Sequence, residues 1–253
     1  MLLRIALLLM FAGQIAIYAQ APICADDNAQ RNCCGATSIE DCPAQGCGGD
    51  PELNRKKNRT SKPTAADVEQ KTLLQIASFT SPASWASGTK RKKLEKWGEG
   101  KAVKVTAFLI KAENYTDGAE STNCNLRTND FNDFHLVLVQ NPSAAKKAVA
   151  KMETNETAGK KAFKRAEKKS LTTEITPRLR PDGWTIAKLR QLARDFAYVR
   201  VTGWAMLDTQ HISRPINRLS NWEIHPVTKF EVCTGTVEDC DQDQNWTKLE
   251  DIP

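Results

Sequence analysis

The stretch SLTTEITPRLRPDGWTIAKLRQLARDFAYVRVTGWAML, residues 170–207, contains a predicted strand, a helix and a second strand in that order. Residues 170–176 are rich in threonine, which is typical of a strand. Apolar residues at helical spacing over 183–196 predict an amphipathic helix. Apolar and β-branched residues predict a strand over 197–207, in which Gly203 indicates a bulge or a sharp bend. This strand–helix–strand unit decides the predicted fold.

Three further strands flank this unit. Alternating apolar residues predict strands over 102–113, 133–140 and 221–232. Three strands, a helix and two more strands are the element order of an OB-fold, a small Greek-key barrel. Closing the barrel also removes the open edges that five strands in a flat sheet would leave. We therefore expect a mainly β chain with helices, built on an OB-fold-like five-stranded barrel with a helix between strands three and four. A β-sandwich is the alternative.

A lysine-rich insertion separates the second and third predicted strands. Residues 143–169 carry nine cations and three acids, so this segment has the same net charge as the whole chain, +6. Its alanine content favours helix, while Gly159 and the threonines around it favour a break into two short helices. We expect a basic helical insertion beside the barrel, or else a disordered loop.

The N-terminus has the composition of a secretory signal peptide. One cation at Arg4 is followed by an apolar run that ends in small residues, with cleavage expected after Ala19. No later stretch approaches the roughly 18 apolar residues of a membrane span. We expect a protein exported to the periplasm or the extracellular space, without a transmembrane segment. The predicted organisation is a signal peptide at 1–19, a Cys-rich polar extension at 20–99, the barrel domain at 100–234 and a C-terminal tail at 235–253.

The cysteines agree with export, because thiols in an oxidising compartment pair into disulfides and eight is an even number. Five lie near the N-terminus, so at least one of these pairs with a distant cysteine if all are oxidised. Their spacing contains no C-x2-C pair and no histidine, which argues against a zinc site. The sequence leaves the pairing open among Cys24, Cys33, Cys34, Cys42, Cys47, Cys124, Cys233 and Cys240.

The basic insertion and two basic runs, 54–59 and 90–93, favour binding of an anionic polymer such as nucleic acid or a cell-surface polysaccharide. OB barrels commonly bind extended polymers near their second and third strands. Runs of lysine are more often solvated surface, so this role is a hypothesis. The residues expected to take part are Lys146, Lys147, Lys151, Lys160, Lys161, Lys164, Arg165, Arg178, Arg180 and Trp184.

Histidines and glutamates on the predicted strands suggest an alternative, catalytic role. His135 and Glu174 lie mid-strand on neighbouring strands, while Glu223 and His225 share one face of the last strand. Such a cluster would hold a divalent metal or transfer a proton, as in an extracytoplasmic hydrolase or a nuclease-like enzyme. A buried histidine paired with a carboxylate serves structure equally well. The sequence names no cofactor and no oligomeric state, and a structural envelope protein is the third possibility.

Five motifs in order resemble a group of exported bacterial proteins of unassigned function: GCGGDPELNRKKNR, NCNLRTNDFNDFHLVLV, TTEITPRLRPDGWT, VRVTGWAMLD and NWEIHPVTKFEV. The similarity runs from about Gly46 to Val232. It implies an exported protein with an OB-like barrel, and it supplies no catalytic residue. OB-fold nucleases of the staphylococcal type place carboxylates and arginines around a calcium ion. The acids and arginines of this chain, Asp133 among them, do not follow that order, so no activity is carried over.

Overall fold

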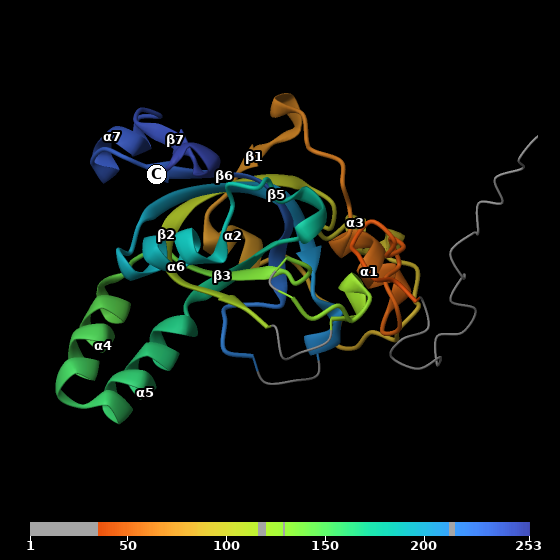
Figure 1. Cartoon of the computed structure of the whole chain (residues 1–253), viewed down its shortest axis with the longest axis horizontal. Helices are drawn as coiled ribbons and strands as arrows, with labels where there is room; N and C mark the ends of the chain where they lie inside the picture. The colour runs from red at the N-terminus through yellow and green to blue at the C-terminus, as the bar shows by residue number, and fades with distance from the viewer. Residues whose placement is uncertain (1–34, 116–119, 129, 213–215) are drawn as a thin grey trace, which may run out of the picture.

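Five strands form a barrel at the centre of this computed structural model, which describes residues 35–115, 120–128, 130–212 and 216–253 (Figure 1). The barrel strands are β2 (Ala102–Asn114), β3 (Phe134–Val139), β4 (Ser170–Ile175), β5 (Tyr198–Leu207) and β6 (Trp222–Cys233). They pair in the order β2–β3–β4–β6–β5, and β5 pairs back with β2 to close the barrel. Within it β4 and β6 run parallel, and the other neighbours run antiparallel. This is the predicted OB-fold-like barrel.

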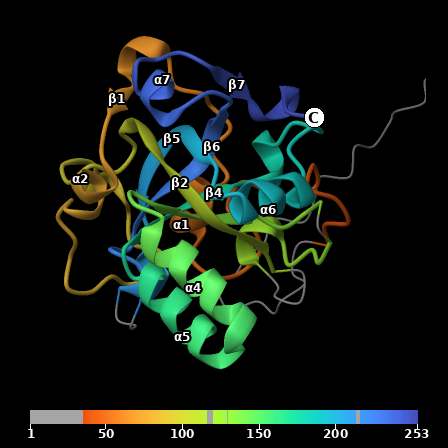
Figure 2. The same cartoon turned by 90° about the vertical axis from the view of Figure 1, so that its left-hand side faces the viewer.

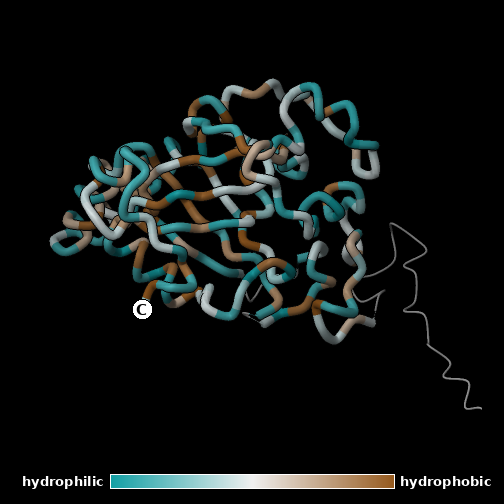
Figure 3. The backbone as a smooth tube through the Cα atoms, turned by 90° about the horizontal axis from the view of Figure 1, so that it is seen from above, coloured by the Kyte–Doolittle hydropathy of each residue, from teal (hydrophilic) through white to brown (hydrophobic). Residues whose placement is uncertain are grey.

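Alternation along the strands turns apolar side chains inward and polar ones outward. On β3, every second residue from Phe134 to Leu138 lies in the core, while the intervening His135 faces outward. Hydrophobic and hydrophilic residues also alternate along the barrel strands in Figure 3. The strand register places His135 opposite Glu113 of β2 and Glu174 of β4. A row of polar side chains therefore crosses the outer face of three strands.

The pairing of β5 with β6 is irregular around Gly203, which confirms the predicted bulge. The register shifts on both sides of this glycine. A Cβ atom at this position would lie 2.4 Å from the carbonyl oxygen of Pro226 and 2.7 Å from Cγ2 of Ile224. Glycine is needed here because β6 approaches the backbone of β5 too closely for a side chain.

Helix α6 (Ile186–Arg194) connects β4 to β5, where an OB-fold places its helix. The side chain of Thr185 caps the helix by accepting a hydrogen bond from the backbone N–H of Lys188. Leu189 packs into the barrel core. The helix ends before the predicted limit, because Phe196 has the left-handed backbone conformation, with φ at 51°.

The lysine-rich insertion folds into two helices, α4 (Ser143–Thr154) and α5 (Glu156–Glu167), which project from the barrel as a hairpin (Figures 1 and 2). The break falls at Asn155, whose side chain accepts a hydrogen bond from the N–H of Ala158 and caps α5. Gly159 does not mark the break. It lies within α5, where a Cβ would come within 2.6 Å of the backbone nitrogen of Met152, so the glycine lets the two helices pack closely.

The segment before the barrel packs onto it. Leu73, Ile76 and Leu94 are buried in the same core as the strands. Arg91 and Glu99 form an ion pair whose two side chains are each 1% exposed. A short strand pairs in parallel with β2. The elements of this segment are α1 (Pro51–Lys57), η1 (Ala65–Asp67), β1 (Glu69–Gln70), α2 (Leu73–Ala77) and α3 (Lys92–Glu95).

The chain beyond β6 also returns to the barrel. Strand β7 (Trp246–Lys248) follows α7 (Val237–Asp241) and pairs antiparallel with β6. Leu249, in η5 (Leu249–Asp251), is buried in the barrel core. The remaining short helices are η2 (Ser121–Asn123), η3 (Pro177–Leu179) and η4 (Thr209–His211).

Two disulfides link the described residues. The Cys42–Cys124 bond ties the N-terminal segment to the loop between β2 and β3, and the Cys233–Cys240 bond ties β6 to α7. The first bond confirms that a cysteine of the N-terminal cluster pairs with a distant one. The expected signal peptide at 1–19 and three cysteines lie outside the described residues: Cys24, Cys33 and Cys34. Across the described ranges, no helix is long and apolar enough to cross a membrane.

Candidate functional site

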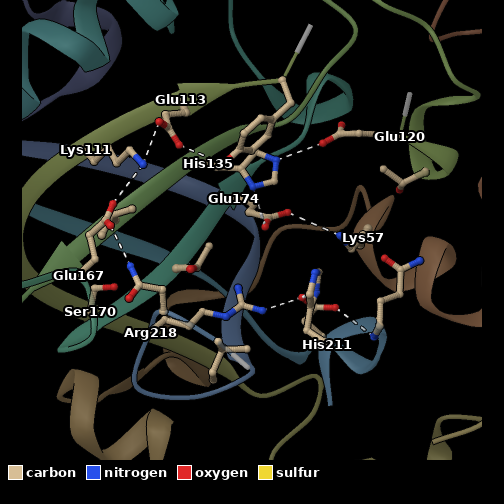
Figure 4. Close-up of a pocket in the computed structure, with 18 of the residues that line it drawn as sticks. Lys57, Lys111, Glu113, Glu120, His135, Glu167, Ser170, Glu174, His211 and Arg218 are labelled. Atoms are coloured by element: carbon tan, nitrogen blue, oxygen red, sulfur yellow. Dashed lines mark hydrogen bonds and ion pairs between the residues drawn. The ribbon is translucent and has the colours of Figure 1, made fainter. Parts of the chain in front are cut away.

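A pocket of about 640 Å³ lies over the outer face of β2, β3 and β4 (Figure 4). Its rim includes the loop between β2 and β3 and the loop between β5 and β6. In OB-folds the corresponding face and loops commonly bind ligands. Five acids, three permanent cations and two histidines line the pocket: Glu113, Glu120, Glu167, Glu174, Asp208, Lys57, Lys111, Arg218, His135 and His211.

His135 lies in the wall of this pocket with a carboxylate on each ring nitrogen. Its Nδ1 is 3.0 Å from Oε1 of Glu174, and its Nε2 is 3.1 Å from Oε1 of Glu120. The ring of Tyr115 packs edge-on against the imidazole, with ring centroids 4.8 Å apart. The His135 side chain is 21% exposed. It is therefore held firmly in place and remains accessible from the pocket.

Glu174 joins His135 to a second, buried histidine. Its Oε2 lies 2.8 Å from Nδ1 of His225 and 3.7 Å from Nζ of Lys57. Only 5% of the Glu174 side chain is exposed. The position follows from the fold, because β4 lies between β3 and β6 and presents Glu174 to histidines on both neighbouring strands. Lys57 comes from α1, far away in the sequence.

His225 is enclosed by three carboxylates. Its Nδ1 also lies 3.4 Å from Oε1 of Glu223, and its Nε2 lies 3.3 Å from Oδ2 of Asp133. Glu223 and His225 are both fully buried, on the face of β6 opposite Trp222, which belongs to the core. The last strand thus buries both of its faces, one in apolar contacts and the other in ionic ones.

A second group of charges borders the same pocket. Arg218 lies 2.6 Å from Oδ2 of Asp208 and 3.2 Å from Oε2 of Glu223. His211, in η4, contacts the same Asp208 oxygen at 2.5 Å. Arg218 therefore links this group to the histidine–carboxylate cluster through Glu223.

The charges of the cluster shift one another's ionisation. Burial opposes a charged imidazole, but the charges and hydrogen bonds of Glu174 and Glu120 raise the pKa of His135 to about 10. Burial also opposes a charge on His225, but the neighbouring carboxylates of Glu174, Asp133 and Glu223 raise the pKa of this ring well above its usual value. Burial likewise opposes the charged form of Glu174, yet its cationic neighbours hold the pKa of that carboxyl well below its usual range. Glu223 differs, because burial and the nearby Glu174 raise the pKa of its carboxyl.

The result is a chain of alternating carboxylates and imidazoles, in the order Glu120, His135, Glu174, His225 and Asp133. One end opens to the pocket, and the other is buried beside the barrel. Such an arrangement fixes the orientation of each ring and favours a proton on it. It places one acid, His135, where a bound molecule can reach it.

The four residues predicted to form a catalytic cluster therefore lie together, although their catalytic role stays a prediction: His135, Glu174, Glu223 and His225. Sequence reasoning placed four of their neighbours elsewhere or gave them no role. Lys57 belongs to the basic run 54–59, which is interpreted from the sequence as a surface for an anionic polymer, and Glu120 lies in an irregular loop. Asp208 and Arg218 both lie in the connection between β5 and β6, where no periodicity indicates the direction of a side chain.

The residues predicted to bind a polyanion divide into two groups. All the cations of the hairpin are exposed, namely Lys146, Lys147, Lys151, Lys160, Lys161, Lys164 and Arg165. The other three make contacts within the chain. Arg178 donates to the carbonyl oxygens of Cys42 and Pro43, and Arg180 stacks over Phe134 with its guanidinium carbon 3.8 Å from the ring centroid. Trp184 is 4% exposed and donates its indole N–H to Glu250.

The hairpin has a groove of its own, separate from the pocket at His135. It measures about 340 Å³ and lies between α4 and α5. Four alanines and four cations line it, the cations being Lys147, Lys151, Arg165 and Lys169. The base of the hairpin reaches the first pocket only through Glu167. The lysines of the hairpin and the histidines of the pocket therefore do not line one common groove.

Comparison of the chain with protein-family models, with curated proteins and with solved structures found no match. The resemblance to a group of exported bacterial proteins accordingly stays a prediction. What the chain does has to be inferred from its site.

Proposed function

We propose that this chain is an exported hydrolase in which His135 and Glu120 carry out acid–base chemistry at the barrel face, with Glu174 orienting the His135 ring. The observation that supports this proposal most strongly is the placement of His135 in a pocket wall, with Glu120 on one ring nitrogen and Glu174 on the other. Export is supported by the two disulfides, because such bonds persist mainly in oxidising compartments.

In the proposed reaction His135 enters as the acid, since its raised pKa keeps the ring protonated at neutral pH. A water molecule attacks the bond to be broken, while Glu120 accepts a proton from that water. The leaving oxygen takes a proton from Nε2 of His135. Glu120 then returns its proton to the same nitrogen, 3.1 Å away, and the site is restored. Glu174 holds the ring by Nδ1 and stabilises its charged form.

A phosphodiester is the substrate class that we propose first. Lys57, Lys111 and Arg218 line the pocket, where a phosphate would compete with their carboxylate partners for these cations. Tyr115 is 50% exposed beside His135 and offers an aromatic surface for a sugar or a base. The volume of about 640 Å³ is in the range of small-molecule sites.

The proposal is tested by hydrolysis of a chromogenic phosphodiester, with a glycoside and a carboxylic ester run beside it. We expect His135→Gln to lower the rate about 10² to 10⁴-fold, the usual contribution of a positioned acid or base. His211→Gln is the matched control, because it removes an imidazole at the pocket rim outside the His135 contacts. Equal activity of the wild type and His135→Gln, or no hydrolysis of any of the three substrates, would reject the proposal.

Binding of an anionic polymer by the α4–α5 hairpin is a second candidate function. The supporting observation is the groove with four cations over a floor of alanines and no acid among its lining residues. A phosphate or sulfate chain lying in this groove would release counterions, so its affinity would fall steeply with salt.

This second function is tested by titrating DNA and heparin at several salt concentrations. Replacing the four groove cations by glutamine should weaken binding and flatten its dependence on salt, by up to about 0.9 in slope for each phosphate that the variant no longer neutralises. The matched control removes the same charge from exposed cations outside the hairpin and the two basic runs: Lys62, Lys101, Arg194 and Lys229. Equal weakening in both variants would show that the binding comes from net charge alone.

A further inference from the structure

Several buried polar atoms of the histidine–carboxylate cluster have no hydrogen-bond partner of suitable geometry within the described part of the chain. They are Oδ2 of Asp133, Oε2 of Glu174, Oε1 of Glu223 and both ring nitrogens of His225. Their close contacts are ion-pair distances whose angles do not make hydrogen bonds. Buried polar atoms in proteins are almost always satisfied, so a group of five such atoms in one place requires an explanation.

The spacing of these atoms matches the ligands of one metal ion. Asp133, Glu174 and His225 each offer a ligand atom, and the three atoms lie within 4.8 Å of one another. Nδ1 of His225 lies 2.8 Å from Oε2 of Glu174 and 3.4 Å from Oε1 of Glu223. Metal–ligand bonds of about 2.0–2.2 Å place neighbouring ligand atoms roughly 3 to 3.5 Å apart. Asp133 contacts the other ring nitrogen, Nε2, at 3.3 Å, so a movement of its carboxylate or of the ring would bring all three residues around one ion.

We infer that Asp133, Glu174 and His225 bind one divalent transition-metal ion, with Glu223 beside them as a further ligand. The ion would take the place of the proton on His225, which is released to solvent. Asp133 and His225 are each 1% exposed, and their unpaired atoms belong to the same cluster. Asp133 immediately precedes β3, Glu174 lies on β4 and His225 lies on β6, so the barrel itself positions the ligands.

The ligand chemistry favours zinc or manganese over calcium. Imidazole together with carboxylates is a typical set for Zn²⁺ and its neighbours in the first transition row. Calcium takes six to eight oxygen ligands and so fits poorly around a histidine. Glu174 would hold the ion through Oε2 while Oε1 holds His135, which is the usual way in which a ligand connects a metal to its surroundings.

The metal site is tested independently of the proposed hydrolysis, because ion binding is measured directly and needs no substrate. The full chain is first stripped of metal with a chelator and then titrated calorimetrically with Zn²⁺ and with Mn²⁺. We expect one saturable site per chain. Asp133→Asn and His225→Gln should each weaken binding at least tenfold. His211→Gln, which removes a more exposed imidazole, should bind as the wild type does.

A second measurement covers the case in which the variants fail to fold. Bound Mn²⁺ broadens the NMR signals of nearby nuclei, so in the wild-type chain it should broaden those of His135 and His225 first. The inference is overturned if neither Zn²⁺ nor Mn²⁺ binds stoichiometrically. It is also overturned by unchanged binding in folded Asp133→Asn and His225→Gln, or by broadening confined to other parts of the chain.

Discussion

Replacing Glu174 by glutamine should have a large effect on stability, because this one carboxylate contacts two histidines and a lysine. Its oxygens lie 3.0 Å from His135, 2.8 Å from His225 and 3.7 Å from Lys57. Glutamine has nearly the same size and keeps the packing, so the change removes charge and little else. All three partners are then left with one negative neighbour fewer.

The structure also sets the size of the effect. The shift of the His135 pKa from 6.5 to about 10 corresponds to roughly 5 kcal/mol in favour of the charged ring, shared between Glu174 and Glu120. Removing one partner of a buried ion pair typically costs 3 to 5 kcal/mol. We expect Glu174→Gln to lower the free energy of unfolding by about 3 to 5 kcal/mol at neutral pH. The contributions of the three contacts to the free energy of unfolding are not additive, because an imidazole without its partner can release its proton.

Urea denaturation at pH 6, 7 and 10 measures this change in stability. The difference between Glu174→Gln and the wild type should shrink at pH 10, where His135 gives up its proton in both proteins. The matched control is Glu156→Gln, which breaks an exposed pair with Lys160 and should cost less than about 1 kcal/mol. If the two variants were destabilised equally, Glu174 would not be the centre of a buried charge cluster.

Three further outcomes are expected. The wild-type chain should lose stability as pH rises from about 6.5 through 10, because the raised pKa values of the site histidines stabilise the fold only while the rings are protonated; pH-dependent urea titrations check this. The Cys42–Cys124 bond closes a loop of 82 residues and the Cys233–Cys240 bond a loop of 7. By the chain-entropy relation, replacing the first pair by serine should lower the free energy of unfolding by about 4.5 kcal/mol, and replacing the second pair by about 2.4 kcal/mol. Equal destabilisation of the two variants in denaturation would contradict this. Gly203→Ala should lower the free energy of unfolding by about 1 to 3 kcal/mol through its clash with β6, and an unchanged midpoint would show that β6 moves freely.

The fold was largely predictable because its signals are local. Alternation marks each barrel strand, and the OB-fold order follows from the sequence of strands and helix. The meeting of His135 with Glu174 was also predictable, since both lie mid-strand on neighbouring strands and the barrel turns them outward together. Spacing by two placed Glu223 and His225 on one face in the same way.

The remaining contacts of the site were not predictable, because they depend on where segments without periodicity come to lie. Lys57 reaches Glu174 from a short helix of the N-terminal segment, and nothing in its basic run indicates that contact. The predicted binding residue Trp184 shows the opposite case. Its partner Glu250 lies 66 residues away, so the sequence could not show that the indole is buried.

The proposed chemistry depends on His135 and Glu174 forming one charged unit in the pocket wall. The most direct test is an NMR titration of His135 in the metal-free wild-type chain. The structure predicts that the imidazole keeps its proton through neutral pH and loses it near pH 10, and that Glu174→Gln moves this transition toward lower pH. A titration of His135 near pH 6.5 in the wild type, unchanged in Glu174→Gln, would contradict the existence of that charged unit.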